Sequence, residues 1–230
     1  MILNKRLFYI LCLFLAFSTS SCSLFKKSSN SKKNGRLSEK QQLDFDYYYF
    51  SSEKEKLIGN ADQAMAFLNK CLQIDPNSAS ANYEIAGLYL SSGRISEALA
   101  FSKKACKLNE TNIWYQLLYA ECLRKNKELK ESALVYKKIA ENNPGRIDLY
   151  YDWANALIYS DNYQDAIKVY DLIESKVGVS EEVCMQKEKL YIRLGSIEKA
   201  AAEIEKLIQQ NPREAKYYGE LANLYGANGQ

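Results

Sequence analysis

Residues 93–105 read GRISEALAFSKKA, a stretch rich in residues that favour helix. Its first alanine belongs to a series of small residues that recurs every 34 positions: Ala64, Ala98, Ser132, Ala166 and Ala200. A fixed period of this length over five units is typical of a repeat array, in which each unit is one supersecondary element. We therefore expect the chain to fold by stacking similar units.

Glycines and prolines follow the same period. Four glycines share one phase, and three prolines stand two periods apart: Gly59, Gly93, Gly195 and Gly229, then Pro76, Pro144 and Pro212. Because glycine favours turns and proline ends helices, each unit reads as a helix, a turn, a second helix and a stop. The small residue near the start of the second helix lets the helices approach to about 8–10 Å. The pattern predicts a repeated helical hairpin.

The hairpins resemble the tetratricopeptide repeat. The first helix of that family carries a large residue, a Leu-Gly or Leu-Ala pair and a tyrosine, an order matched here by Tyr83, Ile85, Ala86 and Tyr89. Its second helix carries alanine, a large apolar residue, a small residue and then proline, matched by Ala64, Leu68, Cys71 and Pro76. Some units depart from the family pattern at Ser51, Ser52, Glu110, Gly178, Lys187 and Glu188.

The resemblance covers residues 41–230 and implies an all-α, right-handed superhelical solenoid. It would contain about five and a half hairpins, with repeats near 45–78, 79–112, 113–146, 147–180 and 181–214 and a half repeat at 215–230.

Residues 1–21 read as a signal peptide. Lys5 and Arg6 precede an apolar run, Leu7 to Phe17, which is shorter than the roughly 20 residues of a membrane span. The small residues before Cys22 resemble the lipobox of bacterial lipoproteins, whose cysteine is lipidated and becomes the first mature residue, although Thr19 stands where leucine is usual. The alternative is an ordinary secretory signal with an incidental cysteine.

The lipoprotein resemblance also implies a location. Acyl chains on Cys22 would anchor the protein stably, and Ser23 after the cysteine, instead of an aspartate, points to the bacterial outer membrane. Residues 22–40 would form a flexible tether, because they are polar and basic and lack apolar periodicity. That basic character favours the periplasmic side of the membrane.

Composition argues against several functions. The chain has no histidine, and so lacks the usual general base and transition-metal ligand. Residues 41–230 carry 23 basic and 27 acidic residues, unlike the basic face of a nucleic-acid-binding protein. We therefore expect no catalytic residue, no cofactor, no metal site and no nucleic-acid partner.

Four cysteines lie within the predicted array, in separate helices and without CxxC spacing: Cys71, Cys106, Cys122 and Cys184. Buried thiols are the expected state. The alternative is a disulfide between Cys106 and Cys122, because an exported protein meets oxidising conditions.

In the tetratricopeptide repeat family the first helices line a concave groove that receives a peptide or another protein. The family register assigns to this groove the residues Tyr49, Tyr83, Trp114, Leu117, Glu121, Arg124, Tyr151, Asn155, Tyr159, Met185 and Lys189. Tyrosine, tryptophan and arginine are enriched at the hot spots of interfaces. The alternative is that several of these side chains pack between hairpins.

The sequence therefore predicts a non-catalytic, lipid-anchored scaffold that binds a protein or peptide partner, in an envelope assembly or secretion complex. One alternative is a glycan-binding uptake lipoprotein of the outer membrane, although the unbroken period leaves no room for the long insertions of those proteins. Another is that the chain is the N-terminal part of a longer signalling or enzymatic protein.

Overall fold

The computed structural model describes residues 37–227, and these residues form eleven helices and no strand. The helices are α2 (Glu39–Leu57), α3 (Ala61–Ile74), α4 (Ala79–Ser91), α5 (Ile95–Leu108), α6 (Ile113–Lys125), α7 (Leu129–Asn142), α8 (Ile147–Tyr159), α9 (Tyr163–Val177), α10 (Glu181–Arg193), α11 (Ile197–Gln210) and α12 (Ala215–Ala227). The predicted all-α fold is confirmed. The signal peptide and the lipidation site at Cys22 lie outside the described residues.

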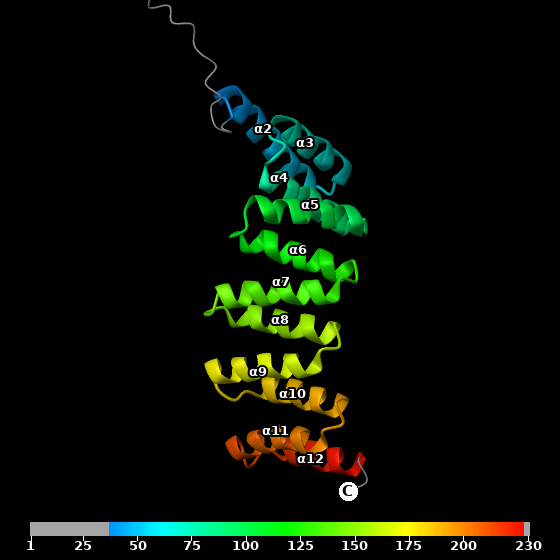
Figure 1. Ribbon diagram of the computed structural model, residues 1–230, viewed down its shortest axis with the longest axis vertical. Helices are drawn as coiled ribbons and strands as arrows, with labels where there is room; N and C mark the ends of the chain where they lie inside the picture. Colours follow the sequence, from blue (N-terminus) through cyan, green and yellow to red (C-terminus); the bar gives the residue numbers. More distant parts are fainter. Residues whose placement is uncertain (1–36, 228–230) are drawn as a thin grey trace, which may run out of the picture. The chain divides into compact units, whose positions relative to one another are not determined.

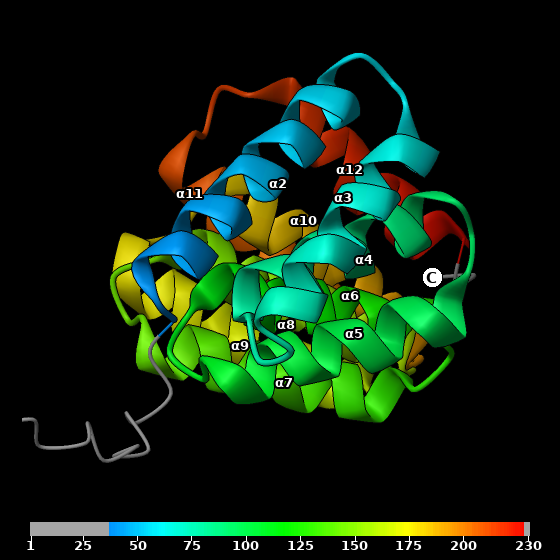
Figure 2. The same ribbon diagram turned by 90° about the horizontal axis from the view of Figure 1, so that it is seen from above.

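Residues 41–227 lie in one compact unit in which the helices stack in chain order (Figure 1). First helices, α2, α4, α6, α8, α10 and α12, alternate with second helices, α3, α5, α7, α9 and α11. In the view from above, α6, α8 and α10 lie nearer the middle of the unit than α7 and α9 (Figure 2). These three first helices therefore share one side of the stack.

The turns that follow α2, α4, α6, α8 and α10 share one backbone conformation. Five residues spaced by 34 positions have positive φ: Gly59, Gly93, Lys127, Asp161 and Gly195. In each turn the next backbone N–H donates to the carbonyl five residues earlier, for example Arg94 to Tyr89 at 2.9 Å. These bonds close the end of the first helix as in a Schellman motif. The glycine period thus reports a left-handed turn, which Lys127 and Asp161 adopt without glycine.

Side chains cap the start of several first helices. Ser78, Asn112 and Ser180 each accept a hydrogen bond from a backbone N–H in the first turn of α4, α6 and α10. Such caps satisfy donors that have no partner within the helix. They fix where each first helix begins, and with it the position of the side chains on its exposed side.

The small residues that define the period are buried. The four alanines of the series are fully enclosed, and Ser132 is nearly so. The hydroxyl of Ser132 donates to the carbonyl of Ala120 at 2.8 Å, so the one polar member of the series has a partner. A larger side chain at these positions would push the two helices of a hairpin apart.

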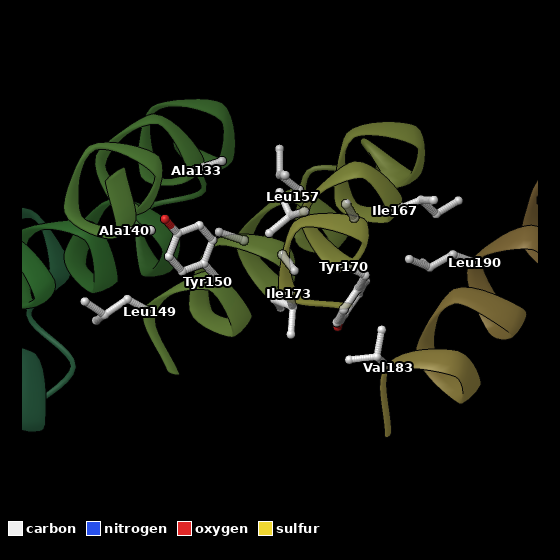
Figure 3. Close-up of a cluster of buried hydrophobic side chains, with 14 of the residues drawn as sticks. Ala133, Ala140, Leu149, Tyr150, Leu157, Ile167, Tyr170, Ile173, Val183 and Leu190 are labelled. Atoms are coloured by element: carbon white, nitrogen blue, oxygen red, sulfur yellow. The ribbon is translucent and has the colours of Figure 1, made fainter. Parts of the chain in front are cut away.

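The apolar core is divided among three clusters along the stack. The largest lies between α7, α8, α9 and α10, where Tyr150 and Tyr170 fill the space between helices (Figure 3). A second joins α10, α11 and α12, and a third joins α2 to α5. Each hairpin is thus stabilised mainly by its neighbours, as in other repeat proteins.

One departure from the family pattern places a charge in the interior. Lys187 of α10 is only 2% exposed, and its ammonium lies 2.6 Å from Asp171, 2.8 Å from Glu174 and 2.9 Å from Glu203. Lys206 of α11 lies 3.0 Å from both glutamates. We call these five residues the Lys187 network. It joins α9, α10 and α11 by ion pairs in addition to their apolar contacts.

A second departure is also accommodated by hydrogen bonding. Ser52 of α2 is fully buried, and its hydroxyl donates to the carbonyl of Tyr49 at 2.6 Å. Its hydroxyl therefore has a partner within its own helix, so burial leaves no unpaired group.

The four cysteines of the array are free thiols. Burial raises the pKa of Cys71 and of Cys184 to about 11, so both stay protonated at neutral pH. The disulfide left open between Cys106 and Cys122 is absent. Protonated, mostly buried thiols behave as small apolar side chains.

Candidate functional site

The residues assigned to the groove all lie on first helices α2 to α10. We call the surface that they and their contacts form the first-helix surface. Trp114, Asn155, Tyr159 and Lys189 are exposed, and the other seven side chains are half-buried. None is enclosed in the core, so each presents some area to solvent.

At the N-terminal end of this surface, Glu84 gathers side chains from two hairpins. The phenol of Tyr49 donates to Glu84 at 3.5 Å, and Lys56 forms ion pairs with both Glu84 and Glu53. Burial and the nearby Glu84 carboxylate raise the pKa of Tyr49 above its ordinary value, so this phenol remains a hydrogen-bond donor. The arrangement links α2 to α4.

The next link is aromatic. The rings of Tyr83 on α4 and Tyr115 on α6 have centroids 5.0 Å apart. A tilted pair at this distance stabilises the contact between helices beyond the area that it buries. Burial raises the pKa of both tyrosines, so both phenols stay neutral.

The middle of the surface is formed by a charged pair that rests on an aromatic ring. Arg124 of α6 donates from Nε to Glu121 at 2.7 Å, and its guanidinium lies 5.1 Å from the ring centroid of Tyr159 on α8. Hydrogen bonding to Glu121 raises the pKa of Arg124. A planar guanidinium held over a ring is preorganised to bind a carboxylate or a carbonyl.

Two further assigned residues lie on the same two helices, Trp114 near the start of α6 and Asn155 within α8. Trp114 is 61% exposed, and neither its ring nor the amide of Asn155 has a side-chain hydrogen bond or ring contact within residues 37–227. An exposed indole without a neighbouring partner offers a large apolar face and one N–H donor to a ligand.

The C-terminal end of the surface is closer to the core. Tyr151 meets the buried Tyr170 edge-on, with centroids 6.1 Å apart, and burial together with Glu182 raises its pKa. Leu117 packs against the largest apolar cluster and Met185 against the second. Part of the surface of these two side chains is therefore buried by packing between hairpins. Lys189 is exposed on α10.

The sequence did not identify every residue of this surface. Glu84 and Tyr115 each adjoin an assigned residue but fall outside the positions that the family register gives to the groove. They reach it because their side chains contact the neighbouring hairpin. The one signal in the sequence is that each directly follows an assigned aromatic residue, Tyr83 or Trp114.

The chemistry of this surface suits recognition of another molecule. It combines aromatic faces with charges of both signs, and ion pairs hold Lys56 and Arg124 in place. Among residues 37–227, no group of three or more His, Cys, Asp or Glu side chains is arranged to hold a metal ion. None of the helices in that part of the chain is both long and apolar enough to cross a membrane.

Comparison with known proteins agrees with this geometry. The sequence profile of the tetratricopeptide repeat matches residues 59–105, which hold α3, α4 and most of α5. A solved tetratricopeptide repeat protein from Parabacteroides merdae superposes with a TM-score of 0.63, at 19% identity over 81% of this chain and 74% of its own. The chain has a tetratricopeptide repeat fold. It has no significant match among curated proteins.

Other tetratricopeptide repeat structures superpose similarly. MamA gives a TM-score of 0.63 at 19% identity, over 76% of this chain and 96% of its own. YrrB, described as a TPR protein with an unusual peptide-binding site, gives 0.59 at 17% identity, over 75% of this chain and 89% of its own. At these identities the likeness concerns the tetratricopeptide repeat fold.

Proposed function

We propose that the protein is a non-catalytic scaffold that binds a segment of a partner protein on its first-helix surface. The observation that carries this proposal is that α6 presents an exposed indole, Trp114, near its start and a guanidinium, Arg124, held over the Tyr159 ring near its end. Tryptophan, tyrosine and arginine are the side chains that contribute most to binding at interfaces. The description of YrrB as having a peptide-binding site supports a peptide as the ligand class.

We further propose that Cys22 is lipidated and holds the scaffold at the periplasmic face of the bacterial outer membrane, in an envelope assembly or secretion complex. The support is the sequence alone: a short apolar run, small residues before the cysteine, and a basic segment after it. Two or more acyl chains give stable anchoring, because each buried CH₂ contributes about 0.8 kcal/mol.

Replacing Trp114 and Tyr151 together with alanine is expected to lower partner affinity at least about 30-fold, which corresponds to about 2 kcal/mol, a typical hot-spot loss. The measurement uses the full chain with a photocrosslinking amino acid at Asn155, and compares the amount of each captured partner in cells. Trp114→Ala alone should give part of the loss. It should leave the unfolding midpoint unchanged because the ring is exposed.

The matched control is Tyr218→Ala, which removes an exposed aromatic ring of α12 outside the assigned surface. It should leave the captured partners as they are. A partner list and yield unchanged by the double variant would show that Trp114 and Tyr151 do not hold the partner, and would overturn the proposal.

Cys22→Ala is expected to abolish incorporation of an alkyne-tagged fatty acid into the protein in growing bacteria, because the thiol is the acceptor of the acyl chains. In-gel fluorescence after labelling measures the incorporation. Cys12→Ala removes the cysteine that precedes Cys22 in the chain and should leave the labelling intact. Labelling that persists in Cys22→Ala would overturn the anchor proposal.

A further inference from the structure

A pocket of about 590 Å³ opens between the second helices α7 and α9. It is separate from the first-helix surface, since none of its lining residues belongs to that surface. Pockets of about 300–1,000 Å³ commonly hold ligands of several apolar groups. This one is large enough for side chains from one face of a helix.

The lining of this pocket is apolar and its rim is basic. Leu134 of α7 is 66% exposed and Leu172 of α9 is 44% exposed, with Trp153 of α8 between the two helices. Lys130, Lys137 and Lys168 are on the rim, against one carboxylate, Asp165. Asp165 is paired with Lys168 at 2.8 Å, and Lys137 lies 3.8 Å from the exposed Glu141. Lys130 has no ion-pair partner in the described part of the chain. The rim therefore keeps positive charge available.

A second apolar surface lies on α2. Leu43, Tyr47 and Phe50 are between 64% and 70% exposed. Their spacing of four and three residues places them on one side of the helix. We call these three residues the α2 stripe.

Acidic residues flank this stripe. Glu39, Asp44 and Asp46 lie within four residues of its members, and Lys40 and Lys54 stand toward its two ends. The charge beside the stripe is therefore negative overall, opposite to the charge on the rim of the α7–α9 pocket. Solvent-exposed apolar residues in such numbers on one helix face mark an interaction site.

We propose that this protein assembles with itself, the α2 stripe of one copy docking in the α7–α9 pocket of a second copy. An amphipathic helix laid in an apolar groove is a common mode of recognition, and the acidic flank of α2 would face Lys130 and Lys137. Within one copy α2 cannot reach this pocket, because α3 to α6 lie between them in the stack (Figure 1). The contact must therefore join different copies.

Such a contact uses two different surfaces of the chain. Heterologous contacts of this kind build rings or open chains instead of closed two-fold dimers. The α7–α9 pocket is distinct from the first-helix surface, whereas the α2 stripe adjoins it where Phe50 contacts Tyr49, with ring centroids 6.3 Å apart. Each copy in the assembly would therefore still present the α4 to α10 part of that surface to a partner. A membrane is the less suited occupant of the α2 stripe, because the acidic flank is repelled by anionic lipid headgroups.

The test places a photocrosslinking amino acid at Tyr47 of the full chain, produced together with a second full chain that carries a different epitope tag. Irradiation in cells should yield an adduct that contains both tags, with crosslinked peptides from residues 130–172. The same amino acid at Lys103, an exposed position on α5 outside both surfaces, should yield no such adduct.

Charge reversal separates specific docking from apolar association. Lys130→Glu with Lys137→Glu should lower the two-tag adduct about tenfold, because like charges would then face each other. Adding Asp44→Lys with Asp46→Lys should restore it. Lys103→Glu with Lys107→Glu, an equal charge change on α5, should have no effect. An adduct indifferent to reversal of the rim lysines, or crosslinking of Tyr47 to lipid or to other proteins alone, would overturn the proposal.

Discussion

Replacing Lys187 with alanine should lower the free energy of unfolding by about 3–5 kcal/mol, the range found when one partner of a buried ion pair is removed. The ammonium lies within 2.9 Å of three carboxylates, and Glu203 is almost as buried as the lysine itself. Without Lys187, Lys206 alone would remain to compensate three negative charges at this junction. Urea unfolding at pH 7, followed by circular dichroism, measures the loss.

The control is Lys168→Ala in the adjacent helix α9. Lys168 also pairs with a carboxylate, that of Asp165 at 2.8 Å, but both side chains are exposed. Exposed pairs contribute about 0–1 kcal/mol. If the two alanine variants lost equal stability, burial would not be the source of the effect.

The pH dependence of the Lys187 variant follows from Glu174. Burial alone would raise the pKa of this carboxyl, but hydrogen bonds from Lys187 and Lys206 lower it below its ordinary value. A lowered carboxyl pKa contributes stability above the unfolded value of about 4.3, and this contribution is lost as the pH falls through the folded value. The stability difference between the native chain and Lys187→Ala should therefore shrink on acidification.

The lysine itself has the opposite dependence. Burial acts to lower the pKa of Lys187, but the hydrogen bonds that it donates to its carboxylate partners outweigh burial and raise the pKa. Its contribution is complete below the unfolded pKa of about 10.4 and is lost only as the pH rises through the folded value. At neutral pH Lys187 should therefore be fully charged.

Tyr170→Ala should also destabilise the fold by about 3–5 kcal/mol, the usual result of removing a buried aromatic side chain. Tyr170 is nearly fully enclosed at the centre of the largest apolar cluster, where Figure 3 shows its ring between α9 and α10. Its ring also meets Tyr151 of the first-helix surface. The variant should lose stability and orientation of Tyr151 together.

Tyr170→Phe provides the comparison, because it keeps the ring and removes only the hydroxyl. A volume-conserving change of this kind should alter stability by less than about 1.5 kcal/mol. Thermal unfolding of both variants, with partner capture below the transition, separates the two effects of Tyr170→Ala. Equal stability of the alanine and phenylalanine variants would mean that the ring does not support the cluster.

Much of the fold followed from one period in the sequence. The regular spacing of small residues predicted the helical pairs, and the alanines at that spacing are enclosed between helices. The sequence did not show that Lys127 and Asp161 take the left-handed turn that glycine takes elsewhere. Glycine has this conformation at no steric cost, but the surrounding hairpin can impose it on other residues, so a turn can persist where its sequence signal is lost.

The interior charge was the other feature beyond sequence reasoning. Lys187 appeared only as a departure from the family pattern, because its carboxylate partners lie on two other helices, α9 and α11. The repeat register predicted which helices carry the residues of the first-helix surface. Its pairs, such as Arg124 with Tyr159, depend on how side chains cross from one hairpin to the next, which periodicity does not specify.

Because the core is divided into three clusters, we expect a pulling force on the two ends to unfold the molecule in separate steps. Because most hairpins depend chiefly on their immediate neighbours, tension along the stack would open it stepwise, with the α2 to α5 cluster and the α10 to α12 cluster parting from the middle as separate events. Hydrogen exchange should accordingly differ from one end to the other. Insertion or deletion of a whole hairpin would alter the reach of such a molecule while leaving the remaining junctions intact.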